Sequence, residues 1–252
     1  MEYPLEETIR ARKSVRSYEK RPLAEEDRAA VEELLAGMQE DSPFPARIMA
    51  RLLEAKPGTD TRKLGTYGVI RGATSFIGVA VQDVPEGMEA VGYSLERVVL
   101  AATARGLGTC WLAGTFNRGQ FEQAMGLAPD DVFCIVCPIG YPSGKQSMVN
   151  SVFRRASGSD LRKPWAELFF DGTPDTPLTP EQAAGYAFPL EMLRLAPSAA
   201  NKQPWRILRA GDALHFFRVE NPKSTYAYDL PRLDVGIGAC HFHLAAQERG
   251  LA

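Results

Sequence analysis

The sequence has no long apolar run and no excess of charge of one sign. None of its hydrophobic stretches approaches the ~20 residues that a membrane-spanning helix needs. The acidic start, Met1–Glu7, lacks the basic and apolar regions of a signal peptide, so we expect a cytoplasmic protein. The net charge is −2, from 29 Lys and Arg against 31 Asp and Glu, and therefore nothing favours nucleic acid or an acidic surface as a partner.

Potential metal ligands are also scarce. Cys134 and Cys137 form a Cys-x-x-Cys within a run typical of a buried strand, where residues three apart point to opposite faces. His241 and His243 lie two apart on a predicted helix and therefore diverge by roughly 200°. We expect neither a metal site nor a redox pair, and we expect the two other cysteines to be core residues: Cys110 and Cys240.

The sequence does have the composition of a globular protein, 45% hydrophobic and 24% charged. Helical periodicity predicts helices at 4–13, Ala24–Met38, Gly87–Leu107 and Arg118–Met125, and a further helix that ends at Leu195. Apolar runs predict strands at Ile48–Glu54, Ser75–Val84, Val132–Ile139 and Arg206–Ala210. A chain of 252 residues can bury a large core, as one domain or as two intimate halves.

The stretch Ala196–Trp205 joins the helix that ends at Leu195 to the strand that follows. Pro197 ends the helix because it has no N–H and disfavours helical geometry in the residue before it. Small residues then leave backbone amides accessible beside the polar groups of Ser198, Asn201 and Gln203, and Trp205 is expected to anchor the packing. Such a turn could hold a flat polar ring, although spacing alone favours an ordinary helix-to-strand loop.

Three motifs resemble those of the FMN-dependent nitroreductase family. The Ala-Pro-Ser-x-x-Asn-x-Gln-Pro-Trp stretch at 196–205 is similar to the family's flavin-contact loop. The run Arg12–Arg16 resembles its N-terminal Arg-x-Ser-x-Arg signature, and Ala101–Gly114 followed by Ile139–Pro142 resembles a third. The order differs from common members, in which the loop follows soon after the Arg-rich motif. It is similar to a divergent branch in which one chain contains two nitroreductase-like halves, and implies an α+β fold with a mixed sheet packed between helices.

The resemblance implies an FMN site. It assigns the dianionic phosphate to Arg12, with the Ser14 hydroxyl as a donor and Lys13 adding charge or a backbone contact. It places Arg16 near N1 and O2 of the flavin, where a cation stabilises the reduced ring and raises the reduction potential. Without the resemblance, these cations would be exposed charges at a helix end.

The resemblance also extends the expected site to three further segments. Ala199 stands where the family often has a second serine, so one hydrogen bond to the flavin is missing, and Gln203 either contacts the ring or braces the loop. The other expected contacts are Pro197, Ser198 and Asn201 along the ring and ribityl chain, Leu112, Ala113 and Gly114 near N5, and Arg162 or Lys163 at the phosphate. The alternatives are close packing after a strand for 112–114 and a solvated loop for the cations of 141–176.

An internal repeat supports two halves. Val91–Leu107 aligns without gaps on Val235–Leu251, although alanine-rich amphipathic helices can look alike by chance. We expect an N-terminal half at 1–145, a crossover at 146–176 and an abbreviated C-terminal half at 177–252. The Arg-rich motif and the Pro-Ser-x-x-Asn loop each occur once, and the place of a second loop, 40–45, carries two carboxylates that would repel an anion. One chain is therefore expected to build one flavin site as a pseudo-dimer, so a monomer is possible.

These implications give a function. The resemblance implies an FMN-dependent oxidoreductase that passes electrons from NAD(P)H to a small aromatic acceptor, such as a nitroaromatic or a quinone. No catalytic acid or base is evident in the motifs, as expected where the cofactor carries the chemistry. Two alternatives remain open: a non-catalytic protein that binds or stores flavin, and a degenerate, flavin-free binding module.

Overall fold

The N-terminal part of the chain forms an antiparallel sheet covered by helices. The computed structural model describes residues 3–40, 42–54, 66, 68–144, 158, 161–220 and 228–251. Four strands pair in the order β1-β2-β4-β3, with every neighbouring pair antiparallel. They are β1 (Ile48–Glu54), β2 (Ser75–Gln82), β3 (Gly108–Thr109) and β4 (Asp131–Gly140). The accompanying helices are α1 (Leu5–Ala11), α2 (Glu25–Ala36), α3 (Gly87–Ala104) and α4 (Arg118–Met125).

The C-terminal part forms a second four-stranded sheet, in the order β6-β5-β7-β8. Its strands are β5 (Phe169–Asp171), β6 (Thr173–Pro177), β7 (Trp205–Ala210) and β8 (Ala213–Arg218). This sheet is mixed, because β5 runs parallel to β7 whereas the other pairs are antiparallel. Its helices are α6 (Pro180–Ala183), α7 (Ala187–Leu195) and α8 (Leu230–Glu248), with short 3-10 turns η1 (Trp165–Glu167), η2 (Ala184–Tyr186) and η3 (Ala199–Asn201).

The α+β class is confirmed, and the predicted elements are present with their ends shifted by a few residues. Two details differ from the expectation. The strands form two sheets, of which only the second is mixed. Residues 165–176, which were expected in the crossover, form η1, β5 and all of β6 except Pro177, and β5 is a strand of the second sheet.

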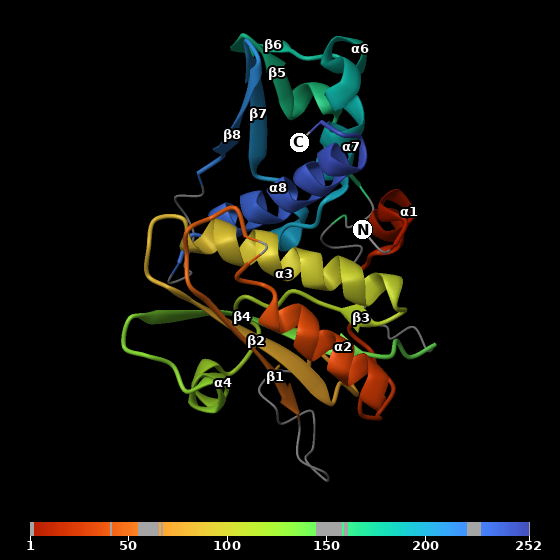
Figure 1. Ribbon diagram of the computed structural model, residues 1–252, viewed down its shortest axis with the longest axis vertical. Helices are drawn as coiled ribbons and strands as arrows, with labels where there is room; N and C mark the ends of the chain where they lie inside the picture. Colours follow the sequence, from red (N-terminus) through yellow and green to blue (C-terminus); the bar gives the residue numbers. More distant parts are fainter. Residues whose placement is uncertain are drawn as a thin grey trace.

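Helices α3 and α8 lie between the two sheets and pack directly on each other (Figure 1). They run in the same direction, since Glu89 pairs with Arg232 near their starts and Glu96 with His241 further along. Their backbones touch at two glycines. A Cβ on Gly92 would lie 2.0 Å from the Leu233 carbonyl oxygen, and a Cβ on Gly236 would lie 2.2 Å from the Glu89 carbonyl oxygen. Only glycine permits this approach.

Helix α1 belongs to the N-terminal part in sequence but packs against α7 and α8 as well as α3 (Figure 1). Its Leu5 and Ile9 share a hydrophobic cluster with Met192 of α7 and Leu244 of α8. The segment that follows α1 is therefore placed where the two parts of the chain meet. This location carries Arg12–Arg16 into the same region as the loop after α7.

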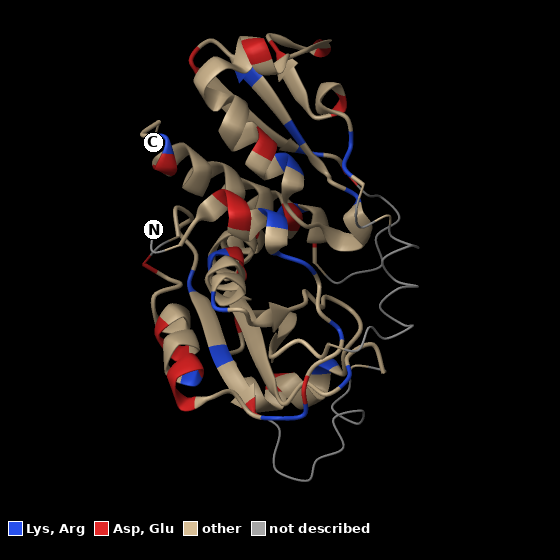
Figure 2. Cartoon of the chain, turned by 90° about the vertical axis from the view of Figure 1, so that its right-hand side faces the viewer, with Lys and Arg blue, Asp and Glu red and all other residues tan. Residues whose placement is uncertain are grey.

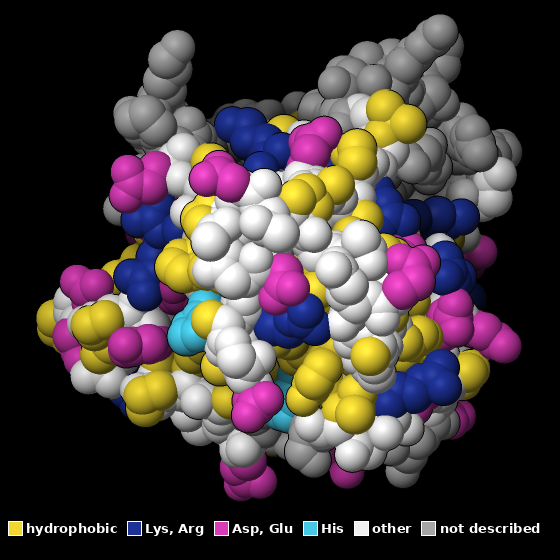
Figure 3. Space-filling model, turned by 90° about the horizontal axis from the view of Figure 1, so that it is seen from above, with side chains coloured by type: hydrophobic (Ala, Val, Ile, Leu, Met, Phe, Trp, Pro, Cys, Tyr) yellow, Lys and Arg dark blue, Asp and Glu magenta, His cyan; other side chains and the backbone are white. Residues whose placement is uncertain are grey.

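Charges of both signs cover the surface (Figure 2), and the cysteines lie in the core. Basic and acidic residues are interspersed over both parts of the chain (Figure 2), and the end view shows both signs mixed with hydrophobic side chains (Figure 3). All four cysteines are buried and free, and no group of metal-binding side chains occurs within the described ranges. Across those same ranges, no helix combines the length and the apolar character needed to cross a membrane.

Candidate functional site

The Arg12–Arg16 segment is an extended stretch held by its backbone. Val15 is buried, its N–H donates to the Thr109 carbonyl at 2.8 Å, and Ser14 forms a bridge with Thr109. Alternate residues of an extended chain face one side, so Arg12, Ser14 and Arg16 project together, opposite Val15. All three side chains lie near the Cys110 thiol.

The pKa of the Cys110 thiol reflects the presence of these three side chains. Burial raises the pKa of Cys110, and the Arg16, Ser14 and Arg12 side chains each act against the rise. The structure therefore places Arg12, Ser14 and Arg16 around one buried thiol. Lys13 is exposed.

The Arg12 side chain is not the exposed helix-end cation of the alternative interpretation. Only 8% of it is exposed, and its Nε lies 3.9 Å from Oε1 of the fully buried Glu96. That distance is too long for a hydrogen bond, and Nε has no hydrogen-bond partner in the part of the chain that the structure describes. A buried guanidinium nitrogen without an acceptor is a candidate donor to an anionic ligand.

Glu96 is a site residue that the motifs missed. Its Oε2 accepts a hydrogen bond from Trp111 Nε1 at 2.9 Å, and its Oε1 lies 2.9 Å from Nε2 of His241. The other ring nitrogen of His241 lies 3.0 Å from the carbonyl of Met192 in α7. The detectable signal was a charged residue on the buried face of an otherwise apolar helix, because buried charges are normally paired.

The Leu112–Gly114 segment begins two residues after Cys110. Leu112 is buried and exchanges two backbone hydrogen bonds with Val136, at 3.0 and 3.1 Å. The Ala113 carbonyl accepts a hydrogen bond from Tyr228 Oη at 2.8 Å, and Tyr228 also donates to the Cys134 carbonyl. Gly114 is exposed. Tyr228 is a contact from the C-terminal part that no sequence motif indicated.

The Pro197–Gln203 loop has an unusual backbone. Among the described residues other than glycine, four have positive φ, and three of these are Ala200 at 49°, Asn201 at 55° and Gln203 at 50°. Each such residue costs on the order of 1–3 kcal/mol, so the surroundings must hold the loop. Ser198 does part of this, because its Oγ accepts the Gln203 N–H at 2.8 Å.

The crossover supplies further support for the loop. Arg162 donates to Asn201 Oδ1 at 3.3 Å and to the Leu195 carbonyl at 3.0 Å. Asn201 Nδ2 donates to the carbonyls of Leu161 and Gly158 at 2.9 and 2.7 Å, and the Lys163 N–H donates to Gln203 Oε1 at 2.8 Å. The structure therefore brings Arg162 and Lys163 to this loop. Three other cations of the crossover lie outside the described residues: Lys145, Arg154 and Arg155.

Asp234 of α8 holds the loop at Ala199, and no sequence motif indicated this residue. Both of its carboxylate oxygens accept the Ala199 N–H, at 3.0 and 3.1 Å. Burial raises the pKa of Asp234 to about 8, although the Ala199 N–H and Lys202 act in the opposite direction. The carboxyl group also lines a pocket of about 340 Å³, together with Lys163 and Arg206.

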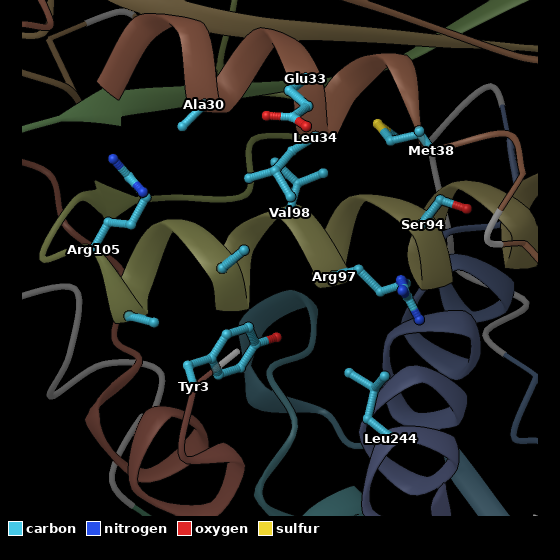
Figure 4. A pocket seen from close by; sticks show the side chains of 13 residues that line it. Tyr3, Ala30, Glu33, Leu34, Met38, Ser94, Arg97, Val98, Arg105 and Leu244 are labelled. Atoms are coloured by element: carbon cyan, nitrogen blue, oxygen red, sulfur yellow. The ribbon is translucent and has the colours of Figure 1, made fainter. Parts of the chain in front are cut away.

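The predicted residues thus form two groups that a chain of contacts connects. Arg12, Ser14 and Arg16 lie around Cys110, which precedes the 112–114 segment by two residues, and the loop contacts Arg162 and Lys163. The connection runs from Arg12 through Glu96 and His241 to Met192 of α7, the helix that leads into Pro197. A separate pocket of about 540 Å³ between α2 and α3 contains none of the predicted residues (Figure 4).

Comparison with known proteins assigns the fold. A family model described as “Putative TM nitroreductase” matches residues 4–246. A Thermotoga maritima structure described as a “putative nitroreductase” has a TM-score of 0.58 and 21% identity, covering 98% of this chain and 86% of that one. This likeness shows a common fold over nearly the whole chain.

Two other solved structures match only part of the chain. A nitroreductase family protein from Clostridium difficile has a TM-score of 0.47 and 19% identity, covering 64% of this chain and 94% of its own. A nitroreductase with bound FMN from Bacteroides fragilis has a TM-score of 0.44 and 18% identity, covering 57% and 91%. No curated protein matches the sequence.

Proposed function

The chain belongs to the nitroreductase family that this model describes, and on that basis we propose that it is an FMN-dependent oxidoreductase. It passes electrons from NAD(P)H to a small aromatic acceptor, such as a nitroaromatic or a quinone. The observation that carries the proposal is the buried Arg12 guanidinium, whose Nε lacks a hydrogen-bond partner among the described residues.

The residues around Arg12 fit FMN. A dianionic phosphate needs cationic and neutral donors, and guanidinium groups bind it in a bidentate manner. Arg12 and the Ser14 hydroxyl lie on one side of the extended segment and supply both kinds of donor. Arg16, on the same side and half-buried, supplies a fixed positive charge for the N1 and O2 region of the ring.

The loop fits FMN in a more limited way. Asn201 and Gln203 use their side-chain groups to brace the crossover, and the Ala199 N–H is taken by Asp234. We therefore assign these three residues to shaping the loop. Ser198 Oγ also accepts the Gln203 N–H, and it keeps its own proton to donate to a ligand beside Pro197. Arg162, which joins the loop to the crossover, adds positive charge on this side of the site, with Lys163 next to it.

Bound FMN supplies two-electron transfer between the nicotinamide donor and the acceptor. Arg12 and Ser14 would hold the phosphate, Arg16 would supply its charge to the ring, and Leu112, Ala113 and Gly114 would offer their backbone to it. No side chain of this set is assigned a proton transfer. Pro197 would line the ring and exclude water from it.

We further propose that the halves at 1–145 and 177–252, joined through 146–176, are related by duplication and share one flavin site. Gly92 and Gly236 occupy equivalent positions of the repeat, 144 residues apart. Each lies against the other helix, and their contacts, Leu233 and Glu89, are also 144 residues apart. This reciprocity is expected of two halves related by a twofold axis. Asp41, in the expected place of a second loop, lies outside the described residues.

The absorption spectrum of the purified protein tests the function. Bound flavin gives a band near ~450 nm, and anaerobic NAD(P)H should bleach that band if the flavin is catalytic. A coloured protein that NAD(P)H does not bleach would instead be a flavin-binding or storage protein. A protein that neither carries nor takes up FMN would be the flavin-free binding module.

A further inference from the structure

The Glu96–His241 pair lies at the contact between α3 and α8, directly beside Arg12. We propose that Glu96 and His241 are positioning residues, which hold the Arg12 guanidinium ready for the phosphate and make anion binding depend on the docking of α8. This inference rests on the proposed flavin site. It concerns how the site is kept in shape, since neither residue is assigned a contact with FMN.

Hydrogen bonding fixes the state of the pair. The Met192 carbonyl can only accept, so the proton of His241 on that side stays on Nδ1, at 3.0 Å from the carbonyl oxygen. On the other side, Nε2 lies 2.9 Å from Oε1 of Glu96, and one proton lies between them. Whichever atom carries that proton, His241 and Glu96 together are neutral. The positive charge of Arg12 is therefore left for a ligand.

The spacing of Arg12 suits this task. At 3.9 Å from Oε1, its Nε is attracted by the carboxylate without donating to it. A direct hydrogen bond would use a guanidinium donor that the phosphate needs. Both side chains are almost fully buried, so the attraction is screened little by water or salt. The carboxylate itself is held on its second oxygen by Trp111.

The Glu96–His241 pair also makes the α3–α8 contact asymmetric. In the repeat, the position equivalent to Glu96 in α8 is Cys240, and the position equivalent to His241 in α3 is Arg97. The equivalent pair therefore has a thiol where Glu96 supplies a carboxylate. Positioning of this kind exists at one end of the pseudo-symmetric arrangement, where the Arg-rich motif lies.

The test is a double-mutant cycle on FMN affinity, measured by quenching of flavin fluorescence. Glu96→Gln keeps both hydrogen bonds, because the amide oxygen accepts from Trp111 and the amide nitrogen donates to Nε2 of a neutral imidazole. It removes the carboxylate charge beside Arg12 together with the proton shared with His241, so the local attraction on Arg12 is lost while the net charge of the pair is unchanged. We expect Glu96→Gln to weaken FMN binding about 3- to 10-fold, and Arg12→Ala about 10- to 100-fold. In the Arg12→Ala background, Glu96→Gln should change the affinity less than about twofold.

The control is Tyr93→Phe, which breaks a different hydrogen bond between these helices, the one between Tyr93 Oη and Nδ1 of His243 at 2.7 Å. It should leave FMN affinity within about twofold of wild type. Equal losses from Glu96→Gln in both backgrounds, or an equal loss from Tyr93→Phe, would reject positioning and leave a structural role. Wild-type protein that binds no FMN would reject the proposed function as well. Circular dichroism of each variant establishes that the fold is intact.

Discussion

Gly92 and Gly236 bring the backbones of α3 and α8 into contact, each against a carbonyl oxygen of the opposite helix. A methyl group at Gly92 would lie 2.0 Å from the Leu233 carbonyl oxygen, where a backbone atom cannot yield without moving its helix. The contact between the two parts of the chain is therefore specified by the absence of side chains.

We predict that Gly92→Ala lowers the free energy of unfolding by about 1–3 kcal/mol, which is the usual cost of overpacking in a core. The measurement is the free energy of unfolding in urea. The matched control is Gly119→Ala in α4, where a Cβ would meet only the Asn117 side chain at 3.9 Å. There the alanine should be neutral or stabilising, by up to about 1 kcal/mol. Equal stability of Gly92→Ala and wild type would contradict the packing.

Asp234→Asn should change how stability depends on pH. Burial raises the pKa of Asp234 from its ordinary value of 3.8 to about 8, so the folded state keeps a proton that the unfolded state has lost. The stabilisation from this proton is complete below pH 3.8 and is lost as the pH rises towards about 8.

The Asn variant has no such titration, and its amide oxygen can accept the Ala199 N–H. Melting temperatures measured at intervals from pH 5 to about 8.5 should therefore show that the stability of wild type, relative to the Asn variant, falls as the pH rises. A difference that stays constant over this range would mean that the carboxylate is as well stabilised as in water. Asp212→Asn, at an exposed position, should give the wild-type curve.

Arg12→Ala should weaken FMN binding about 10- to 100-fold, because it removes charge-assisted hydrogen bonds to the phosphate. Titration of the protein with FMN, followed by fluorescence, measures this. Arg10→Ala is the control, since Arg10 is an exposed cation that pairs with Glu6 on α1. Unchanged affinity after Arg12→Ala would remove Arg12 from the site.

Arg16→Gln should lower the two-electron reduction potential of the bound flavin by tens of millivolts, where ~30 mV corresponds to about 1.4 kcal/mol. The substitution removes the charge and keeps hydrogen-bond donors. Spectroelectrochemistry of both proteins, each saturated with FMN, gives the comparison. Equal potentials would show that Arg16 does not act on the ring.

A single site shared by both halves should bind one FMN per chain. Calorimetry gives the ratio, and size-exclusion chromatography at decreasing concentration shows whether binding survives in the monomer. Two FMN per chain, or binding that disappears as the protein dissociates, would reject the shared site. An intact ratio in the monomer supports it.

Sequence patterns predicted the elements best where burial is uniform. The long helix α3 and the strand β4 are apolar through most of their length, and both lie where periodicity placed them. Strand β6 could not be found this way, because its five residues, Thr173–Pro177, are all exposed and include two prolines. The Asp171-Gly172 turn is a local sign of its antiparallel pairing with β5, whereas the parallel pairing of β5 with β7 is a tertiary contact that no local propensity encodes.

The candidate site was predictable only in its motif residues. Arg12, Ser14 and Arg16 could be named because a resemblance marked them, and alternation in an extended chain explains why they face one side. Glu96 and Asp234 act through partners on remote segments, Arg12 and Ala199, and their role exists only after the helices dock. The one local sign of Glu96 and of Asp234 was a charged residue on the buried face of an otherwise apolar helix.

The docking of α1 also constrains how the chain folds during synthesis. Leu5 and Ile9 are buried against Met192 and Leu244, residues that leave the ribosome long after them. Until α7 and α8 emerge, the apolar face of the first helix has no complete partner, and the Arg-rich segment behind it cannot be fixed in place. Contacts between such distant parts of a chain form slowly and leave apolar surface open in the meantime. The first helix to be synthesised thus acquires its packing partners last, and the proposed flavin site forms only after α7 and α8 have docked on it.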